Sequence, residues 1–497
     1  MARSPTNDLA NRRCRLRARD GWLRRSPCGN VIAFSPASPP SDAKVNVTGG
    51  QKAALAGLAV VSLAAAIFDL FGYALVLLGL ITTVYFLIVL FRTYATARAA
   101  TEGAITVAPH ELDALSDDEL PSYTVLLPMY RERDVVKELA RNVARLDYPP
   151  SKLQVLFLID HDDEETLEAA RAMDLPPHMR LLVSHPRPVR TKPRALNVGL
   201  ANATGDYVVV FDAEDRPEPD QLKKAVIAFR KAPPDTVCIQ AKLQYFNPNT
   251  NLLTKLFAAE YATFFGLMLP GLARLRSPVP LGGTSNHFTI SALRELGGWD
   301  PYNVTEDLDL GMRVARQGWR VALMESVTWE EANSQIPNWI NQRSRWIKGH
   351  IQTYFVHMRS PLELLRDLGP ADFLIFQSIV LGTPLMLLLN PLLWLMTLVW
   401  VVTRATAIEA LYPPPIWFMG ASAMFLGNLL FVYFTMGGCM LRGLYPNVKW
   451  MLLAPLYWML MSLAAWKALL QFFVRPHHWE KTVHGLVERT EVAEEAA

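Results

Sequence analysis

Two long apolar blocks constrain this chain more than any other feature. Residues 53–91 are almost continuously apolar, and the chain turns apolar again from about residue 371 to 474. A bilayer core takes about 20 apolar residues for each crossing helix. Each block is therefore long enough for at least two crossings, and the sequence predicts a multi-pass membrane protein with a soluble domain between its transmembrane helices.

The overall composition agrees with this prediction. The chain is 51% hydrophobic and 19% charged, and its net charge of +3 is too small to indicate a nucleic-acid partner. Membrane lipids are the expected surroundings. The four cysteines (Cys14, Cys28, Cys238 and Cys439) are far apart, so we expect neither a disulfide framework nor a zinc site.

The N-terminal region divides into a tail and a helical hairpin. Residues 1–50 are rich in Arg, Pro and Ser and lack an early apolar segment, which predicts a disordered, basic tail and no signal peptide. Residues 51–93 are predicted to form two transmembrane helices with a break near Asp69. Because arginines lie in the tail and at Arg92 and Arg98, the positive-inside rule places both flanks in the cytoplasm.

A soluble α/β domain is predicted at 120–333, after a polar linker at 94–119. Buried-strand patterns alternate with helical segments, which indicates a parallel sheet covered on both faces. The predicted strands are 123–128, 153–160, 180–184 and 207–212, and the predicted helices are 134–146, 165–173 and 195–203. Ligands of such sheets bind at the carboxyl ends of the strands, where Asp160 and Asp212 fall.

A helix that follows the domain carries polar and aromatic residues on one face. Residues 334–369 are predicted to form amphipathic helices at the membrane interface, and positions i, i+3 and i+4 place Gln342, Arg345 and Trp346 together. The Arg fork suits a diphosphate, and an indole can stack on the apolar face of a sugar. The alternative is a helix whose Arg and Trp only anchor it at a membrane surface.

The second apolar block is predicted to hold four crossings within residues 370–475, before a cytoplasmic tail at 476–497. The expected crossings are 371–389, 391–410, 414–437 and 449–474, with a tight hairpin around Asn390 and Pro391. Four crossings leave Arg442 and Lys449 outside, against the charge rule, whereas three would export the tail. We favour four because the apolar stretch from 371 to 403 exceeds one crossing.

Acidic residues follow the strand that ends near 212. Carboxylates at a strand end form a hard-oxygen site, so Asp212, Glu214 and Asp215 are candidate ligands of Mg²⁺ or Mn²⁺. The alternative is a solvated acidic turn. Asp160 and Asp162, at the end of a second strand, favour the metal site.

Other segments suggest contacts with substrates. Asp307 is a candidate general base, although Glu306 and Asp307 could simply be acidic residues at the start of a helix capped by Thr305. Thr284 lies in a segment of small residues that a ligand could approach closely, or in an ordinary glycine turn. Lys192 precedes a helix and is a reasonable neighbour for a phosphate. The histidines show no metal-ligand spacing.

The ordered set of motifs resembles the membrane-embedded branch of glycosyltransferase family 2, the cellulose, chitin and hyaluronan synthase-like enzymes. The resemblance covers roughly residues 123–346 and the flanking apolar segments. Its motifs are Asp160, Asp212-Ala213-Glu214, Thr305-Glu306-Asp307 and Gln342-Arg343-Ser344-Arg345-Trp346. The resemblance implies a nucleotide-diphospho-sugar transferase (GT-A-like) fold and an inverting reaction.

Residue roles are carried over from the resemblance position by position. Asp307 would be the catalytic base. The donor would be bound by Asp160, Asp162, Lys192, Asp212, Gln342 and Arg345, the acceptor by Trp346, Glu306 and Thr284, and the metal by Asp212, Glu214 and Asp215. The chain departs from the usual Asp-x-Asp, because a Glu stands at the third position, so the choice between Glu214 and Asp215 stays open. Trp479-Glu480-Lys481-Thr482 loosely resembles a cellulose synthase gating loop.

These features together predict the activity of the chain. We expect transfer of a hexose from UDP-glucose or UDP-N-acetylglucosamine to a growing polysaccharide, coupled to export across the cell (inner) membrane, with the catalytic domain in the cytoplasm. The closest alternative is the transfer of one sugar to a lipid acceptor. A further alternative is a membrane scaffold without catalysis.

Overall fold

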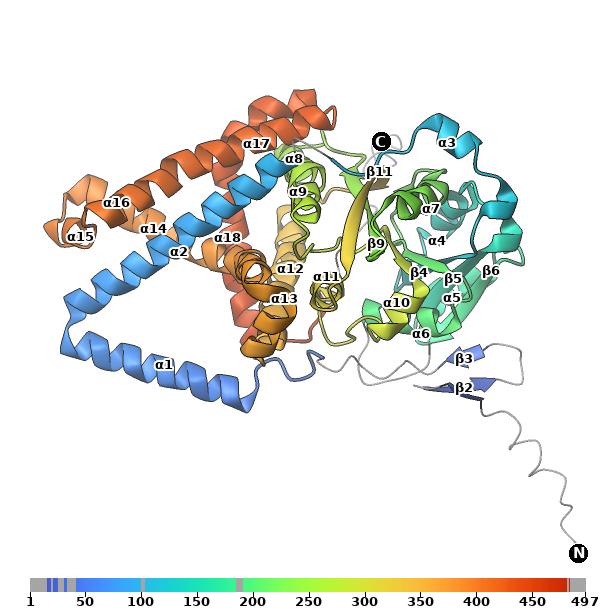
Figure 1. Ribbon diagram of the computed structural model, residues 1–497, viewed down its shortest axis with the longest axis horizontal. Helices are drawn as coiled ribbons and strands as arrows, with labels where there is room; N and C mark the ends of the chain where they lie inside the picture. The colour runs from blue at the N-terminus through green and yellow to red at the C-terminus, as the bar shows by residue number, and fades with distance from the viewer. Residues whose placement is uncertain are drawn as a thin grey trace, which may run out of the picture.

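The computed structural model describes residues 42–99, 103–184, 191–480 and 482, and the backbone of three short strands before them. An α/β domain occupies one side of the molecule and long helices extend from it to the other side (Figure 1). The N-terminal strands β1 (Leu16–Ala18), β2 (Gly21–Arg25) and β3 (Val31–Ala33) pair antiparallel. These strands lie within residues 1–50, so the prediction of a disordered tail over that whole range is wrong. Most of the predicted C-terminal tail lies outside the described residues.

The α/β domain contains an eight-stranded mixed sheet. Four strands are parallel, as the sequence predicts: β4 (Tyr123–Met129), β5 (Leu153–Asp160), β6 (Met179–Ser184) and β7 (Tyr207–Val210). The remaining strands are β8 (Arg216–Pro217), β9 (Thr236–Tyr245), β10 (Asn286–Thr289) and β11 (Arg320–Glu330), in the overall order β6-β5-β4-β7-β10-β9-β11-β8. Because β10 runs antiparallel to both β7 and β9, the prediction of a parallel sheet is wrong for this half.

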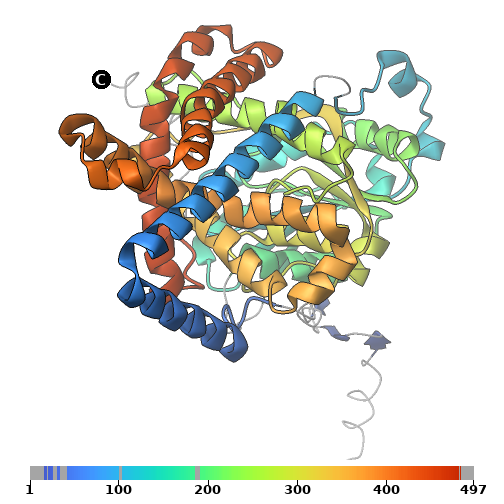
Figure 2. The same cartoon turned by 60° about the vertical axis from the view of Figure 1, so that its left-hand side comes forward.

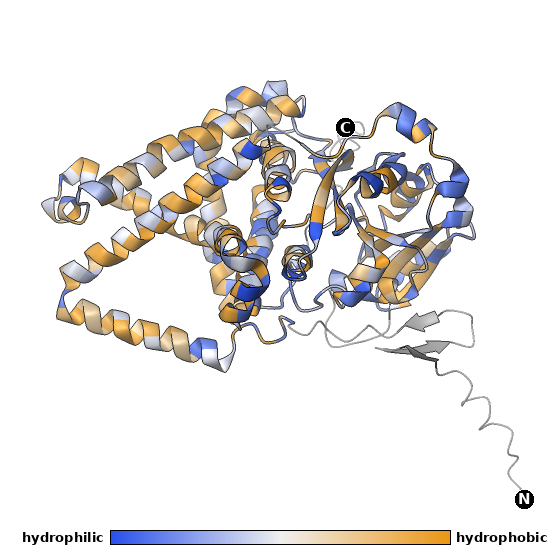
Figure 3. Cartoon of the chain, in the orientation of Figure 1, coloured by the Kyte–Doolittle hydropathy of each residue, from blue (hydrophilic) through white to orange (hydrophobic). Residues whose placement is uncertain are grey.

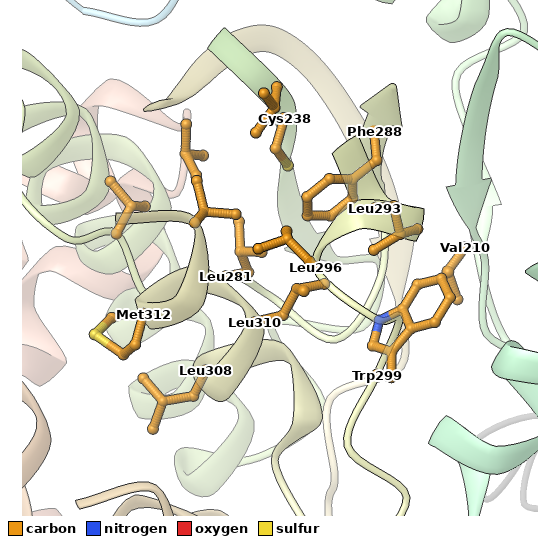
Figure 4. Packing of buried hydrophobic residues seen from close by; sticks show 14 of the residues in the cluster. Val210, Cys238, Leu281, Phe288, Leu293, Leu296, Trp299, Leu308, Leu310 and Met312 are labelled. Carbon is orange, nitrogen blue, oxygen red and sulfur yellow. The ribbon is translucent and has the colours of Figure 1, made fainter. Parts of the chain in front are cut away.

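The central strands are buried on both faces. In β4 the side chain of Leu126 joins one apolar cluster, while Val125 and Leu127 join the other. Successive residues of a strand point to opposite faces, so this alternation supplies two cores. Figure 4 shows the first core, where Trp299 packs near Val210 and Phe288.

Helices cover both faces of the sheet (Figures 1 and 2). Those of the domain are α3 (Pro109–Asp113), α4 (Val136–Ala144), α5 (Glu164–Arg171), α6 (Lys192–Asn202), α7 (Gln221–Lys231), α10 (Ile290–Glu295) and α11 (Glu306–Arg316). The helix α12 (Ile336–His357) lies against α11. A Cβ at Gly349 would overlap the Thr305 side chain, so this glycine lets α12 approach the start of α11 closely.

Six helical segments of the described chain are long and apolar enough to cross a membrane. They are α1 (Gly49–Phe68), α2 (Leu70–Arg98), α8 to α9 (Leu252–Arg274), α13 to α14 (Pro361–Thr403), α16 to α17 (Pro414–Leu441), and a last segment, Tyr445–Val474, that ends in α18 (Ala454–Val474). The apolar side chains of these helices give the orange ribbons that extend from the domain in Figure 3. The α8 to α9 segment is mostly buried within the protein, so its apolar side chains serve packing.

The predicted hairpin around Asn390 and Pro391 is wrong. Helix α14 (Gly382–Thr403) continues through Pro391, and the helical path breaks earlier, at Gly369, which has a φ of 76°. The apolar stretch is longer than one crossing because its first turns, including Phe376 and Val380, are buried against the protein. Three apolar segments therefore follow α12, in place of the four that were predicted.

Helix α18 lies alongside α12, with both of its ends on the domain side (Figures 1 and 2). Arg442, which precedes it, forms an ion pair with Glu325 of β11 at 2.9 Å. Near its other end, Lys467 contacts Asn341 of α12 and pairs with Glu480 at 3.0 Å. The charge conflict of the prediction thus disappears, because Arg442 and the chain after α18 both lie beside the domain.

Candidate active site

One cavity of about 700 Å³ joins the sheet edge to the long helices. Asp160 and Asp212 line it from the ends of β5 and β7, and Asp307 lines it from the start of α11. Arg345 and Trp346 line it from α12. The fold thus brings together residues that lie almost 200 positions apart in the sequence.

Lys192 compensates part of the acidic charge at the sheet edge. Its Nζ lies 2.7 Å from Asp212 Oδ2 and donates to the carbonyl oxygen of Gly283 at 2.8 Å. Burial disfavours the ammonium, but the charges of Asp212, Glu306 and Asp307 outweigh it and raise the pKa of Lys192. A cation at this position suits a phosphate that approaches the start of α6.

Glu214 and Asp215 have different surroundings, which bears on the choice that the sequence left open. Glu214 lines the cavity, and burial together with the charge of Asp212 raises its pKa to about 7. Asp215 is fully buried beneath the loop, where it accepts hydrogen bonds from the Asp212 backbone N–H and the Thr284 hydroxyl. The structure therefore favours Glu214 over Asp215 as a metal ligand. Thr284 lines the cavity as well, while its hydroxyl contacts Asp215 and the carbonyl oxygen of Val210, so its contact with an acceptor stays a prediction.

Glu306 and Asp307 begin α11, as predicted, and both face the cavity. Thr305 stands at the N-cap position, but its side chain makes no capping hydrogen bond. Burial raises the pKa of Asp307, and burial with the neighbouring Asp307 charge raises the pKa of Glu306 to about 7 despite the opposing charge of Lys192. A carboxylate whose pKa is raised toward neutrality is a better proton acceptor at neutral pH.

The polar face of α12 points into the cavity. Gln342 and Arg345 line it, and the Gln342 side-chain oxygen is buried without a hydrogen-bond partner. The guanidinium of Arg345 lies 4.5 Å from the ring centre of Trp479, which is part of the segment after α18. Trp346 also lines the cavity, and its ring is nearly parallel to that of Tyr261 at 6.2 Å. The sequence prediction that these residues share one face holds.

Arg343, which stands between those residues in the sequence, has a structural environment. It forms two hydrogen bonds with Glu260, one of them at 2.9 Å, and donates to the Tyr457 hydroxyl at 2.9 Å. Its guanidinium also lies over the ring of Trp346 at 4.6 Å. These contacts fix the indole of Trp346 and join α12 to α8 and α18.

The two aspartates predicted at the end of β5 are separated. Asp160 lines the cavity and accepts a hydrogen bond from the Ser184 hydroxyl. Asp162 lies outside the cavity lining, 3.9 Å from the His161 ring nitrogen. The structure therefore places Asp160 with the other acids, and it does not bring Asp162 to them.

Glu330 was not predicted as a site residue from the sequence, and Trp479 was named only through a loose resemblance to a gating loop. Glu330 ends β11 and lines the cavity, and burial beside the acids near Asp212 raises its pKa well above the ordinary value. Because β11 was not predicted as a strand, the sequence did not indicate that the acid at its end would reach the cavity. Trp479 and Thr482 line the cavity, which agrees with the loose resemblance to a gating loop.

The carboxylates of Asp212 and Glu214 suit a divalent cation that is also bound by a diphosphate. Within the described part of the chain, no three His, Cys, Asp or Glu side chains converge on a metal position. Mg²⁺ commonly uses only one or two carboxylates and takes its other ligands from phosphates and water. Asp212 and Glu214 can supply those carboxylates, and burial together with the Asp212 charge raises the pKa of Glu214, which Lys192 opposes only in part.

Sequence comparison places this geometry in a known class of enzyme. The chain carries a glycosyltransferase domain with a GT-A-like fold. Residues 121–349 match the family described as glycosyltransferase like family 2, so the domain belongs to that family.

Curated relatives match over the same part of the chain. Probable glycosyltransferase YdaM of Bacillus subtilis is 26% identical over 235 residues, which cover 47% of this chain and 56% of the relative. Glucomannan 4-beta-mannosyltransferase 2 of Arabidopsis thaliana is 27% identical over 252 residues (48% and 46%). Beta-monoglucosyldiacylglycerol synthase of Trichormus variabilis is 27% identical over 263 residues (51% and 54%). The chain spans about half the length of these relatives.

Among solved structures, the mannosyltransferase PcManGT from Pyrobaculum calidifontis, in complex with GDP-Man and Mn²⁺, aligns with a TM-score of 0.47 and 20% identity. The alignment covers 80% of this chain and 98% of that one.

Proposed function

We propose that this protein is an inverting, membrane-embedded glycosyltransferase that moves a hexose from a UDP-sugar to an acceptor on the membrane side of its active site. The observation that carries the proposal is the single cavity, which runs from Asp212 and Asp307 to residues of the long apolar helices such as Tyr85 and Asn390. UDP-glucose and UDP-N-acetylglucosamine are the proposed donors. The mannosyltransferase among the relatives adds a mannose donor to the screen.

In this proposal Asp307 accepts the proton of the attacking hydroxyl. The hydroxyl oxygen attacks the anomeric carbon from the side opposite the diphosphate, so the new glycosidic bond forms as the bond to the diphosphate breaks. Burial raises the pKa of Asp307, which strengthens it as a base. Trp346 and Glu306 line the same cavity as Asp307 and are proposed to orient the acceptor.

The leaving diphosphate is proposed to bind between the sheet edge and α12. Lys192, Gln342 and Arg345 supply donors to its oxygens, and Asp160 binds the nucleoside. Asp212 and Glu214 would hold Mg²⁺ or Mn²⁺, which would supply positive charge to the departing diphosphate. Arg345 is suited to this role because its guanidinium donates two parallel hydrogen bonds.

For the acceptor, we propose a growing polysaccharide that passes along the cavity between the helices. The lining there includes the aromatic rings of Phe431, Phe434 and Trp458. Flat aromatic faces suit the apolar faces of sugar rings. A continuous path would let the product move away from Asp307 without crossing lipid.

The arrangement of the helices supports a cytoplasmic catalytic domain. We propose four crossings of the cell (inner) membrane: α1, α2, α13 to α14 and α16 to α17. Helix α18 would then lie at the interface beside α12, which keeps Arg442 on the cytoplasmic side, as the positive-inside rule requires.

Donor screening tests the proposal directly. Membranes that contain the full chain are supplied with each labelled nucleotide sugar and Mg²⁺ or Mn²⁺, and the products are sized. Incorporation of label into a polymer that requires Asp307 is the expected result. No transfer from any nucleotide sugar would contradict it.

A second candidate, the transfer of one sugar to a lipid, is favoured by one relative, the monoglucosyldiacylglycerol synthase. It uses the same donor site. Label found only in a chloroform-soluble product would establish this candidate and exclude the polymer.

A further inference from the structure

The two ends of the cavity differ in charge. The sheet end is lined by Asp160, Asp212, Glu214 and Asp307, whereas the lining residues from α2, α14, α17 and α18 in the described chain include no carboxylate. Arg92 of α2 is the charged residue in that second set. Glu260 of α8 also lines the cavity, but it is paired with Arg343, so Arg92 leaves the membrane end of the cavity with a net positive charge.

The contacts of Arg92 leave its charge uncompensated. Its guanidinium donates to the Thr383 hydroxyl at 2.6 Å and to the carbonyl oxygen of Ser378 at 3.3 Å. Its Nε is buried without a hydrogen-bond partner, and within the described residues no acidic side chain pairs with it. A charged side chain among apolar helices is costly and usually has a partner or a function.

Two further polar side chains of the cavity lining, Tyr85 and His350, are already hydrogen-bonded within the protein. Tyr85, about two helical turns before Arg92, also lines the cavity and donates to Asn390 Oδ1 at 2.9 Å. His350 lines the cavity from α12, and burial, with a smaller contribution from the nearby Arg92, lowers its pKa to about 4. His350 is thus neutral at pH 7, and Arg92 is the group that attracts an anion.

This cationic end lies close to the acceptor position. His350 is four residues after Trp346, which corresponds to about 6 Å along a helix. An acceptor that contacts Trp346 can therefore reach Arg92 with a group only a few bonds from its reacting hydroxyl. The cavity lining also includes apolar side chains such as Phe264, Ile379 and Met386, which suit the hydrocarbon part of a lipid.

We propose that Arg92 binds the phosphate of a membrane lipid that carries the acceptor or primer hydroxyl into the active site. The proposal rests on the proposed function and names the chemical class of the acceptor, a phosphate-bearing lipid. It is compatible with a single transfer and with the start of a polymer. The Arg fork suits phosphate oxygens, which accept several hydrogen bonds at once.

Binding is tested without turnover by native mass spectrometry of the full chain in an uncharged polyoxyethylene detergent. The probes are phosphatidylglycerol, diacylglycerol and inorganic phosphate. We expect wild type to retain phosphatidylglycerol in preference to diacylglycerol, and Arg92→Gln to lower that retention about tenfold or more. Arg98→Gln removes the same charge from the same helix outside the cavity lining and is the matched control.

Turnover supplies the second readout. In the same micelles, Arg92→Gln should lower kcat/KM for transfer to phosphatidylglycerol about tenfold or more while the KM of the donor stays unchanged, and Arg92→Lys should recover part of the loss. An unchanged donor KM also shows that the variant is folded.

The outcomes separate the two proposals. Equal retention of phosphatidylglycerol by wild type and Arg92→Gln, an equal loss in Arg98→Gln, or equal retention of diacylglycerol would overturn the inference. Retention of inorganic phosphate alone would also overturn it, because the site would then bind a free anion and no lipid. Normal retention with no sugar transfer from any donor would overturn the proposed function and leave the lipid site standing.

Discussion

Asp307 and Asp309 lie two residues apart at the start of α11, yet their surroundings are opposite. Asp307 faces the cavity, where burial raises its pKa. Asp309 is fully buried, accepts hydrogen bonds from Arg313 at 2.8 Å and His357 at 3.0 Å, and these partners outweigh burial and lower its pKa. Side chains two residues apart on a helix point to nearly opposite sides, so one sequence motif serves two environments.

The two aspartates differ in role: Asp307 is placed for reactivity and Asp309 for stability. The carboxylate of Asp309 is compensated by Arg313 and His357, and it joins α11 to the end of α12. The carboxylate of Asp307 has no such compensation on its own helix and is open to a substrate. A buried carboxylate without a paired cation can be stabilised by a hydrogen bond from a substrate hydroxyl. A carboxylate that is already paired has no free acceptor for such a bond.

The largest expected effect is on turnover in Asp307→Asn. We expect kcat to fall by about 10²- to 10⁴-fold because the amide cannot accept the hydroxyl proton. The thermal unfolding midpoint should stay near that of wild type. Turnover and thermal melting of the purified full chain check both statements, and wild-type kcat would remove Asp307 from its role.

The opposite result is expected for Asp309→Asn. Loss of this anion leaves Arg313 buried without its paired carboxylate and weakens the hydrogen bond to His357, which should cost about 3–5 kcal/mol of stability. The folded fraction should keep most of its turnover. Denaturant unfolding, with activity expressed per folded molecule, measures the two effects, and an unchanged unfolding midpoint would show that the network is not stabilising.

A smaller loss is expected in Arg345→Lys. Lysine keeps the charge but cannot make the forked contact with a diphosphate, so kcat/KM should fall by about ten- to a hundredfold. Arg366→Lys makes the same exchange at an exposed side chain outside the cavity lining and is the matched control. Wild-type kinetics in Arg345→Lys would contradict the diphosphate contact.

The smallest effect concerns the pH dependence of stability. The pKa of Glu306 is about 7 in the folded protein, against an ordinary value of 4.5. The folded carboxyl binds its proton more tightly, so the free energy of unfolding should fall by about 1–3 kcal/mol as pH rises from about 4.5 to about 7, and then level off. Glu306→Gln should remove this fall. The free energy of unfolding of both proteins, measured at pH 5 and pH 8, tests this expectation. An equal fall in wild type and Glu306→Gln would show that Glu306 does not cause the pH dependence.

The strands β4 to β7 and the polar face of α12 were predictable because their signals are local. Continuous apolar runs mark buried strands, and spacings of three and four mark one face of a helix. The apolar blocks marked the long helices in the same way. These patterns depend on residues near one another in the chain.

The mixed half of the sheet and the path of the last helices could not be predicted in this way. Strand β10 has four residues, and its direction depends on its pairing with β7 and β9. The sequence of α18 is as apolar as a crossing helix, and only its contacts with α12 place it beside the domain. Hydrophobic composition reports burial and does not distinguish lipid from protein as the surroundings.

By itself, the sequence determined which residues could carry the chemistry: the acids after β5 and β7, the pair that starts α11, and Gln342, Arg345 and Trp346. The tertiary structure decided which of them meet. It turned Glu214 toward the cavity and Asp215 beneath the loop, left Asp162 outside, and added Glu330 and Arg92. The physical reason is that a carboxylate or guanidinium takes its role from the charges around it, and most of those charges come from distant parts of the chain.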